Sequence, residues 1–136
     1  MKTIDIYCDG GSRGNPGPAA SGSVVVEDGK VVATKAEYLG ITTNNQAEYR
    51  AVLLGLELMK EFKTTSAHFY LDSQLVVRQI QGRYKVKDPG LRVIYLEIMQ
   101  KLADLDVEFT HVLRAKNKLA DAAVNDCLDA HMDKNK

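Results

Sequence analysis

The stretch from residue 4 to residue 17, IDIYCDGGSRGNPG, constrains the fold more strongly than any other part of the chain. Apolar and polar side chains alternate in its first half, and a period of two predicts a β-strand. A carboxylate, Asp9, follows, and the glycines, asparagine and proline of 10–17 predict that regular structure ends there. The strand is therefore expected to place Asp9 at its tip, where Gly10 and Gly11 leave room for a polymer to approach closely.

Three further acids occupy similar positions, which favours a functional role for Asp9 over that of a solvated residue opening a tight turn. Asp72 follows a second short strand, predicted at 67–71. Glu48 and Asp121 fall in the first turns of two predicted helices. The helix dipole favours an acid in a first turn, so Glu48 alone would not indicate a site. The four acids together indicate one.

The rest of the chain predicts an alternation of strands and helices. Asp28-Gly29 between two β-type runs predicts a hairpin. Apolar residues at helical spacing predict helices, with Asn44 and Asn117 as candidate N-caps of two of them. The expected strands are about 2–9, 20–27, 30–39, 67–71 and 107–113, and the expected helices are about 45–62, 73–80, 90–104 and 118–130.

This order predicts an α/β fold with a mixed five-stranded sheet and helices on both faces. The first three strands have short connections and are expected to form an antiparallel meander, while the last two follow helices and should run parallel to the first. Sites in open α/β sheets lie beyond the carboxyl ends of parallel strands. Asp9 and Asp72 should therefore be neighbours if their strands are neighbours. A length of 136 residues favours a single domain over 1–136.

The charge balance excludes a strongly basic protein whose overall electrostatic field attracts nucleic acid. Eighteen basic and eighteen acidic residues give a formal net charge of zero, so binding to a polyanion must depend on local patches and bound metal ions. Cys8 and Cys127 show neither metal-ligand spacing nor a disulfide framework, which favours reduced core residues and a cytoplasmic protein. No apolar run is long enough to cross a membrane. We expect no membrane partner and no obligatory protein partner.

The four acids also indicate a class of chemistry. Carboxylates grouped without basic partners repel one another, and a hard cation relieves that repulsion. Mg²⁺ prefers oxygen ligands, keeps several waters and shares its coordination shell with substrate phosphate. Two such ions about 4 Å apart can bind the attacking and leaving oxygens of an in-line displacement. The pattern therefore predicts metal-assisted cleavage or transfer of a phosphodiester.

Nearly all of the chain resembles the type 1 ribonuclease H family. Taken singly the matching segments are weak signals, but their joint order and spacing are highly specific. The resemblance implies a ribonuclease H-like fold and an endonuclease that hydrolyses the RNA strand of RNA/DNA hybrids. The matching segments are YCDGGSRGNPGPAASG (7–22), TTNNQAEYRAVLLGLE (42–57), FYLDSQLVV (69–77) and HVLRAKNKLADAAVN (111–125).

The resemblance further implies metal-binding and catalytic roles for the four acids Asp9, Glu48, Asp72 and Asp121. With the carboxylate chemistry above, it predicts a two-metal-ion mechanism that leaves 5′-phosphate and 3′-hydroxyl ends. Mg²⁺ is the expected cofactor, and Mn²⁺ is expected to support activity as well.

Further positions carry over from the family as predicted substrate contacts. Asn15, Asn45 and Gln74 match polar residues that follow the sugar-phosphate backbone and its 2′-hydroxyls, and Thr43 matches a residue of a phosphate pocket for the DNA strand. Structural alternatives remain for three of them. Asn15 can serve its turn, Asn45 the cap of its helix, and Gln74 the first turn of its helix.

The first departure from the family pattern concerns substrate binding. Many members carry an extra helix and a basic protrusion after the helix that follows the third acid, and here 81–90 is too short for them. Arg83, Lys85 and Lys87 are expected to replace part of that charge, unless they form only a solvated surface.

The second departure concerns the loop before the fourth acid, where many bacterial members have a histidine that assists catalysis. No histidine lies between Arg114 and Asp121. Arg114 is therefore the first candidate for that assisting role, and Lys116 the second.

Two other functions remain open. A non-catalytic module that binds hybrids is the main alternative, although a pure binding protein gains nothing from clustered like charges. Another nuclease or a transposase-like protein of the same fold is a further alternative, because fold alone does not determine function. Cleavage of double-stranded RNA is a possible side activity.

Overall fold

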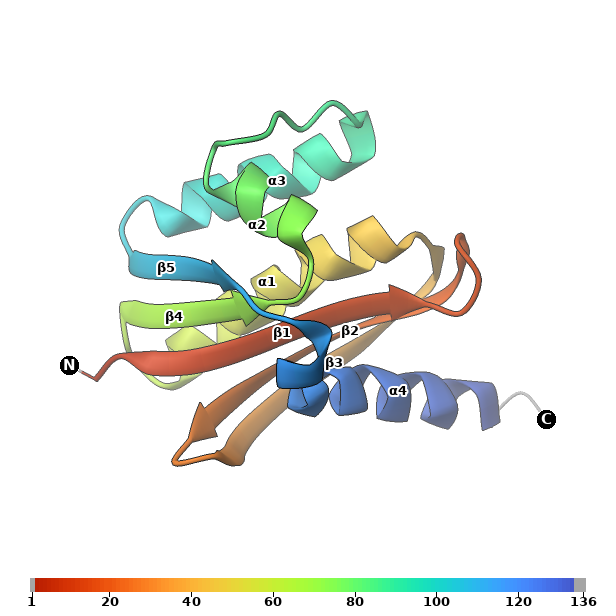
Figure 1. Ribbon diagram of the computed structural model, residues 1–136, viewed down its shortest axis with the longest axis horizontal. Coiled ribbons are helices and arrows are strands. Elements are labelled where there is room, and N and C mark those ends of the chain that lie inside the picture. The colour runs from red at the N-terminus through yellow and green to blue at the C-terminus, as the bar shows by residue number, and fades with distance from the viewer. Residues whose placement is uncertain (1, 134–136) are drawn as a thin grey trace.

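A computed structural model describes residues 2–133 of the chain. Strands and helices follow one another in the predicted order (Figure 1). They are β1 (Ile4–Ser12), β2 (Gly17–Glu27), β3 (Lys30–Thr42), α1 (Asn44–Glu61), β4 (Ser66–Leu71), α2 (Gln74–Ile80), α3 (Pro89–Leu102), β5 (Asp106–His111), the short 3₁₀ helix η1 (Arg114–Lys116) and α4 (Lys118–Asp133).

The five strands form one mixed sheet in the order β3-β2-β1-β4-β5. β1, β2 and β3 form the antiparallel meander, and β4 and β5 continue the sheet parallel to β1. At the tip of the β2–β3 hairpin, Asp28 and Gly29 have φ values of 52° and 76°. Two adjacent residues with positive φ are typical of the tight turn that Asp-Gly favours. The predicted fold class and hairpin are confirmed.

The first strand is longer than its sequence predicts. Regular structure does not end after Asp9, because β1 continues to Ser12 and pairs with β2, with Gly10 opposite Ser21 and Gly11 opposite Ala20. The antiparallel partner supplies the hydrogen bonds that stabilise this glycine segment. Asp9 instead follows the end of the parallel ladder with β4, whose last pair is Cys8 and Leu71.

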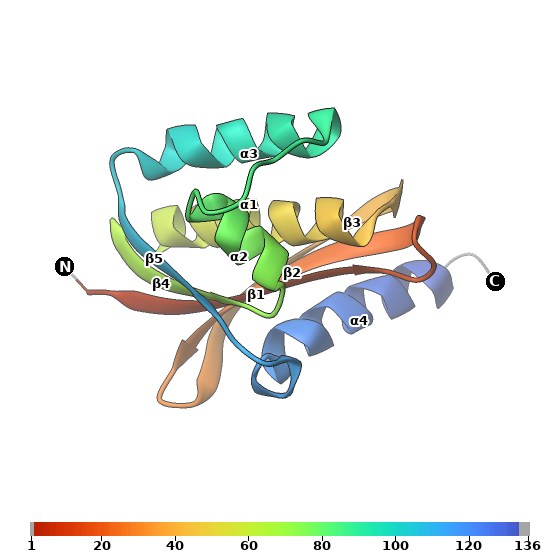
Figure 2. The ribbon, with the colours of Figure 1, turned by 45° about the horizontal axis from the view of Figure 1, so that its top comes forward.

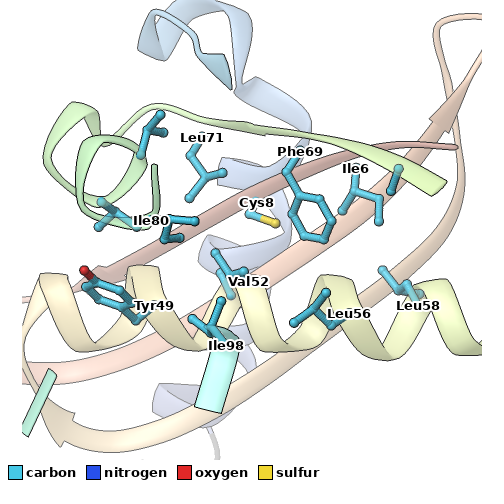
Figure 3. Packing of buried hydrophobic residues seen from close by; sticks show 14 of the residues in the cluster. Ile6, Cys8, Tyr49, Val52, Leu56, Leu58, Phe69, Leu71, Ile80 and Ile98 are labelled. Carbon is cyan, nitrogen blue, oxygen red and sulfur yellow. The ribbon is translucent and has the colours of Figure 1, made fainter. Parts of the chain in front are cut away.

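The helices form two layers around the sheet. α1, α2 and α3 lie over one face, and α4 lies over the other (Figure 2). The main core lies between α1 and the sheet, where Ile6 of β1, Phe69 of β4 and Val52 of α1 are all fully buried (Figure 3). This packing places the amino end of α1 beside the carboxyl ends of β1 and β4.

Two smaller expectations can be compared with the described residues. Cys8 is buried, Cys127 is half-buried, and both are free thiols. Within 2–133, none of the helices combines the length and apolar character needed to cross a membrane.

Candidate active site

Asp9 and Asp72 lie side by side at the end of the parallel ladder. Each is the next residue after the last paired position, since Cys8 pairs with Leu71. Asp9 is buried, with 7% of its surface exposed, and Asp72 is half-buried. The expected proximity of these two carboxylates therefore follows directly from the adjacency of β1 and β4.

Glu48 joins them because Gly10 allows α1 to lie directly against β1. A Cβ atom on Gly10 would come within 2.2 Å of the Ala47 carbonyl carbon and 2.4 Å of the Glu48 nitrogen. The Gly10 N–H donates a hydrogen bond to Glu48 Oε1 at 3.3 Å, and the Ser21 hydroxyl donates one to the Ala47 carbonyl at 2.6 Å. Glycine at position 10 thus brings a helix acid to the strand acids.

The three carboxylates form a compact group. Asp9, Glu48 and Asp72 each offer an oxygen, and these oxygens lie within 4.8 Å of one another. Burial, followed by the charge of Asp72, raises the pKa of Asp9 to about 7. Burial, followed by the charge of Asp9, raises the pKa of Glu48 well above its usual value. None of the ion pairs found among residues 2–133 involves these three acids.

The donor atoms of this group suit a hard divalent cation. All three side chains present oxygen, which is the ligand that Mg²⁺ prefers. Glu48 Oε2 is buried and has no hydrogen-bond partner in the described part of the chain. A buried charged oxygen without a partner is costly, and a bound cation would remove that cost. The residues therefore fit a site for a hard divalent cation.

Asp121 stands slightly apart from the group. It lies in the first turn of α4, on the opposite face of the sheet from α1, and is half-buried. Its oxygens are outside the three-carboxylate group, but its charge contributes to the raised pKa of Asp9, after burial and Asp72. The structure thus brings three of the four predicted acids together and places the fourth nearby.

Asn117 is a site residue whose role the sequence did not indicate. Its side chain is fully buried, and its amide nitrogen donates to the Cys8 carbonyl at 2.8 Å and to Asp72 Oδ2 at 3.1 Å. It was expected to cap α4 with its side chain, but Asn117 Oδ1 has no partner among residues 2–133. In the sequence, its position one turn before Asp121, inside a segment that resembles the family, could have indicated a role at the site.

The three acids line an open cleft of about 340 Å³. Two predicted residues, Asn45 and Arg114, line the same cleft. Asn44 and Ser73 also line it and were not predicted to do so, whereas Lys116 is not part of the lining. The complete lining is Asp9, Asn44, Asn45, Glu48, Asp72, Ser73 and Arg114.

The glycine-rich segment is tied to the start of α1. The Asn44 N–H donates to Asn15 Oδ1 at 3.1 Å, and Asn44 Oδ1 accepts from the Ser12 N–H at 2.7 Å. Because Ser12 occupies its side chain, Asn44 is not the N-cap of α1, contrary to expectation. Thr43 is the N-cap and accepts a hydrogen bond from the Gln46 N–H. Asn15 and Thr43 therefore have structural partners and lie outside the cleft lining.

The remaining predicted contacts are distributed around the site. Gly10 is buried beneath α1 and Gly11 is half-buried, while Gln74 is exposed at the first position of α2. Lys85 and Lys87 are exposed in 81–88, the segment that connects α2 to α3. None of these five residues lines the cleft.

Comparisons with known proteins place this chain in a family. A family model described as reverse transcriptase-like matches residues 7–127. A ribonuclease HI of Halobacterium salinarum is 44% identical over 128 residues, covering 93% of this chain and 64% of that protein. A bifunctional protein of Mycobacterium tuberculosis is 41% identical over 133 residues, covering 96% of this chain and 36% of that protein.

A solved ribonuclease H1 structure has a similar fold. LC11-RNase H1 in complex with an RNA/DNA hybrid is 39% identical, with a TM-score of 0.89 and coverage of 96% of this chain and 99% of that one. The chain spans little more than a third of the length of its mycobacterial relative.

Between α2 and α3 the structure has only the short segment 81–88, without an extra helix. The chain belongs to the type 1 ribonuclease H family, as a short-form member without the basic protrusion.

Proposed function

We propose that this chain is an endonuclease that hydrolyses the RNA strand of RNA/DNA hybrids and depends on a divalent cation. The observation that carries the proposal is the group of three carboxylates within 4.8 Å, one of which has a buried oxygen without a hydrogen-bond partner among residues 2–133. Relatives named ribonuclease H and the hybrid-bound neighbour support the substrate class. Mg²⁺ is the proposed metal, with Mn²⁺ as a substitute.

Asp9, Glu48 and Asp72 would bind the metal, with Asp121 nearby. Two bound cations would supply an activated water and would neutralise charge on the scissile phosphate. The chain's own residues prepare this site. The Gly10 N–H binds Glu48 Oε1 and leaves Oε2 for the metal, and Asn117 orients Asp72. Water attacks the phosphorus and the 3′-oxygen departs, which leaves 5′-phosphate and 3′-hydroxyl ends.

Selection of RNA must come from groups that contact the sugars, because the phosphates of RNA and DNA are alike. Asn45 lines the cleft beside the acids, and its amide can both donate to and accept from a 2′-hydroxyl. Arg114, which also lines the cleft, offers a guanidinium for the phosphate. Asn15, Thr43 and Gln74 are proposed contacts further along the strands.

The proposal is tested by incubating the purified chain with end-labelled RNA/DNA hybrid, duplex RNA and duplex DNA. Each substrate is given Mg²⁺, Mn²⁺ or a chelator. We expect cleavage of the RNA strand of the hybrid with either metal and none with the chelator. Product ends are identified by phosphatase and ligase treatment, and cleavage of duplex RNA would reveal the side activity.

Two results would contradict the proposal. Tight binding of the hybrid without cleavage under any metal condition would favour the non-catalytic binding module. Equal cleavage of duplex DNA would leave a general metal-dependent nuclease without selection for RNA.

A further inference from the structure

The segment between α2 and α3 is firmly attached to the body of the protein although it has no regular structure. We call residues 83–87 the basic arm, because their sequence is Arg-Tyr-Lys-Val-Lys. The arm begins with backbone bonds, since the N–H groups of Arg83 and Tyr84 donate to the Arg78 carbonyl at 2.9 and 3.3 Å. In its middle, Val86 is buried in the main core with only 6% of its surface exposed.

A buried side-chain amide binds the arm between these points. Gln79 of α2 is 6% exposed, and its Nε2 donates to the Lys85 carbonyl at 3.1 Å. The other half of the same amide, Oε1, accepts a hydrogen bond from the hydroxyl of Tyr49. Both ends of the Gln79 amide are therefore occupied, and the bonds link α1, α2 and the arm in one chain.

Tyr49 is well placed to donate the first of these linked hydrogen bonds. Its ring is fully buried on α1, and its hydroxyl is turned toward α2 (Figure 3). Burial raises the pKa of Tyr49, so the hydroxyl remains protonated and serves as a donor. Tyr49 also directly follows Glu48 in the sequence, and Asn45 lies one turn earlier and lines the cleft. The helix that carries a site acid thus also anchors the arm.

The other end of the arm is also close to α1. Asp88 caps α3 by accepting from the Leu91 N–H at 3.0 Å. A Cβ atom on Gly90 would come within 2.9 Å of Gln46 Nε2, so the start of α3 lies against the first turn of α1. The arm is therefore fixed at both ends and in its middle relative to the helix that lines the cleft.

The exposed side chains of the arm are mostly cationic. Arg83, Lys85 and Lys87 are exposed, while Val86 between the two lysines points into the core. The chain as a whole has no net charge, so a fixed local row of cations is what could attract a phosphate backbone. Ordering a mobile segment on binding opposes affinity, and a segment that is already ordered avoids this cost.

We propose that Tyr49 and Gln79 are positioning residues for hybrid binding, which hold the basic arm in a fixed place against α1 and α2 without contacting the nucleic acid. This inference rests on the proposed function. A purely structural role is the alternative, because buried polar groups are normally hydrogen-bonded in any core. The two roles differ in what they change. Positioning affects affinity for the hybrid, whereas a structural role affects only stability.

The test uses Tyr49→Phe and Gln79→Met, which remove the hydroxyl and the amide with little change in shape. We expect each variant to raise the dissociation constant for the hybrid about three- to tenfold, which corresponds to the free energy of roughly one hydrogen bond. The kcat at saturating hybrid should not change. The salt dependence of binding should become shallower. Trypsin should cut after Arg83, Lys85 or Lys87 faster than in the wild type, because the arm is released.

Two controls separate the roles. Thr64→Val removes buried hydroxyl bonds to the Lys2 carbonyl and the Ser66 backbone on another part of the protein, and it should lower stability without changing affinity. In a background of Arg83→Gln, Lys85→Gln and Lys87→Gln, Gln79→Met should have little further effect on affinity. Unchanged affinity of Tyr49→Phe and Gln79→Met, or full additivity with the neutralised arm, would overturn the inference. A wild-type chain that neither binds nor cleaves the hybrid would instead overturn the proposed function itself.

Discussion

The buried amide of Asn117 donates a hydrogen bond to the carboxylate of Asp72, at 3.1 Å from Nδ2 to Oδ2. The same nitrogen donates to the Cys8 carbonyl at 2.8 Å, immediately before Asp9. One side chain from the start of α4 therefore connects the ends of β1 and β4 and restricts the orientation of Asp72. Its hydrogen bond also satisfies one carboxylate oxygen and leaves the other for a ligand.

Replacing Asn117 should weaken metal binding as well as catalysis. Asn117→Asp removes the donor and adds a further carboxylate beside Asp72, and we expect kcat and Mn²⁺ affinity to fall about 10- to 100-fold, as for other residues that orient metal ligands. Isothermal titration of Mn²⁺ and kinetics on the hybrid measure the two effects. Asn125→Asp, on the exposed side of α4, adds the same charge as a control. Equal behaviour of the two variants would contradict an orienting role for Asn117.

Adjacent glycines should respond very differently to alanine. A Cβ at Gly10 would overlap the backbone of α1 at 2.2 Å, whereas at Gly11 the nearest atom, Asn44 Oδ1, would be 4.0 Å away. We expect Gly10→Ala to destabilise the protein by about 3 kcal/mol or more and to abolish cleavage, because Glu48 must move from Asp9. Gly11→Ala should change the free energy of unfolding by less than about 1 kcal/mol. Urea unfolding measures both, and similar losses would contradict the close packing of α1 on β1.

Stability of the metal-free protein should decrease as pH rises. The pKa of Asp9 is raised from 3.8 to about 7, and that of Glu48 is raised as well, so the native state binds more protons than the unfolded state between these values. The resulting stabilisation is fully present below about pH 4 and is lost as pH rises through about 7. Urea unfolding with chelator across this range should show the decrease.

Two changes should reduce that pH dependence. Asp9→Asn removes one of the two carboxyls with a raised pKa, and it should increase the free energy of unfolding near neutral pH by about 1–2 kcal/mol, since one pKa unit corresponds to about 1.4 kcal/mol. Saturating Mg²⁺ should stabilise the wild type near neutral pH but not Asp9→Asn. A variant with the same pH profile as the metal-free wild type would show that these acids do not repel one another.

Arg114 is expected to assist the reaction less than any of the acids. It lines the cleft, where a cation can bind the scissile or departing phosphate. Arg114→Ala should reduce kcat about tenfold, the effect of one charge-assisted hydrogen bond. Arg114→Lys separates charge from geometry, because lysine lacks the planar guanidinium. Lys116→Ala is the matched control outside the cleft lining, and a greater loss for Lys116→Ala than for Arg114→Ala would transfer the role to Lys116.

The core of the site could be predicted because it depends on local patterns. Alternating apolar residues predicted β1, a short run rich in aromatic residues predicted β4, and the order of elements predicted that the two strands run parallel. Asp9 and Asp72 follow the last pair of that ladder, so their proximity required no knowledge of side-chain contacts. The helical pattern likewise placed Glu48 near the amino end of its helix, but its expected place in the first turn is wrong, because α1 already begins at Asn44 and its first turn holds no acid.

Other features could not be predicted because distant segments determine them. Gly10 to Ser12 remain in β1 only because β2 pairs with them, although glycines locally favour a turn. Asn44 and Asn117 have the local character of N-caps, yet Ser12 and Asp72 use their side chains. The bond from Tyr49 to Gln79 joins residues 30 positions apart and leaves no periodic signal in the sequence.

Cleavage of the RNA/DNA hybrid by Asp72→Asn, compared with the wild type in Mg²⁺, tests the central claim most directly. Asn keeps the shape of the side chain and removes the charge that binds a hard cation. The account predicts a folded protein, with a circular dichroism spectrum like that of the wild type, whose cleavage of the RNA strand falls to the level seen with chelator. Near-normal Mg²⁺-dependent cleavage by Asp72→Asn would contradict the assignment of Asp9, Glu48 and Asp72 as the metal site.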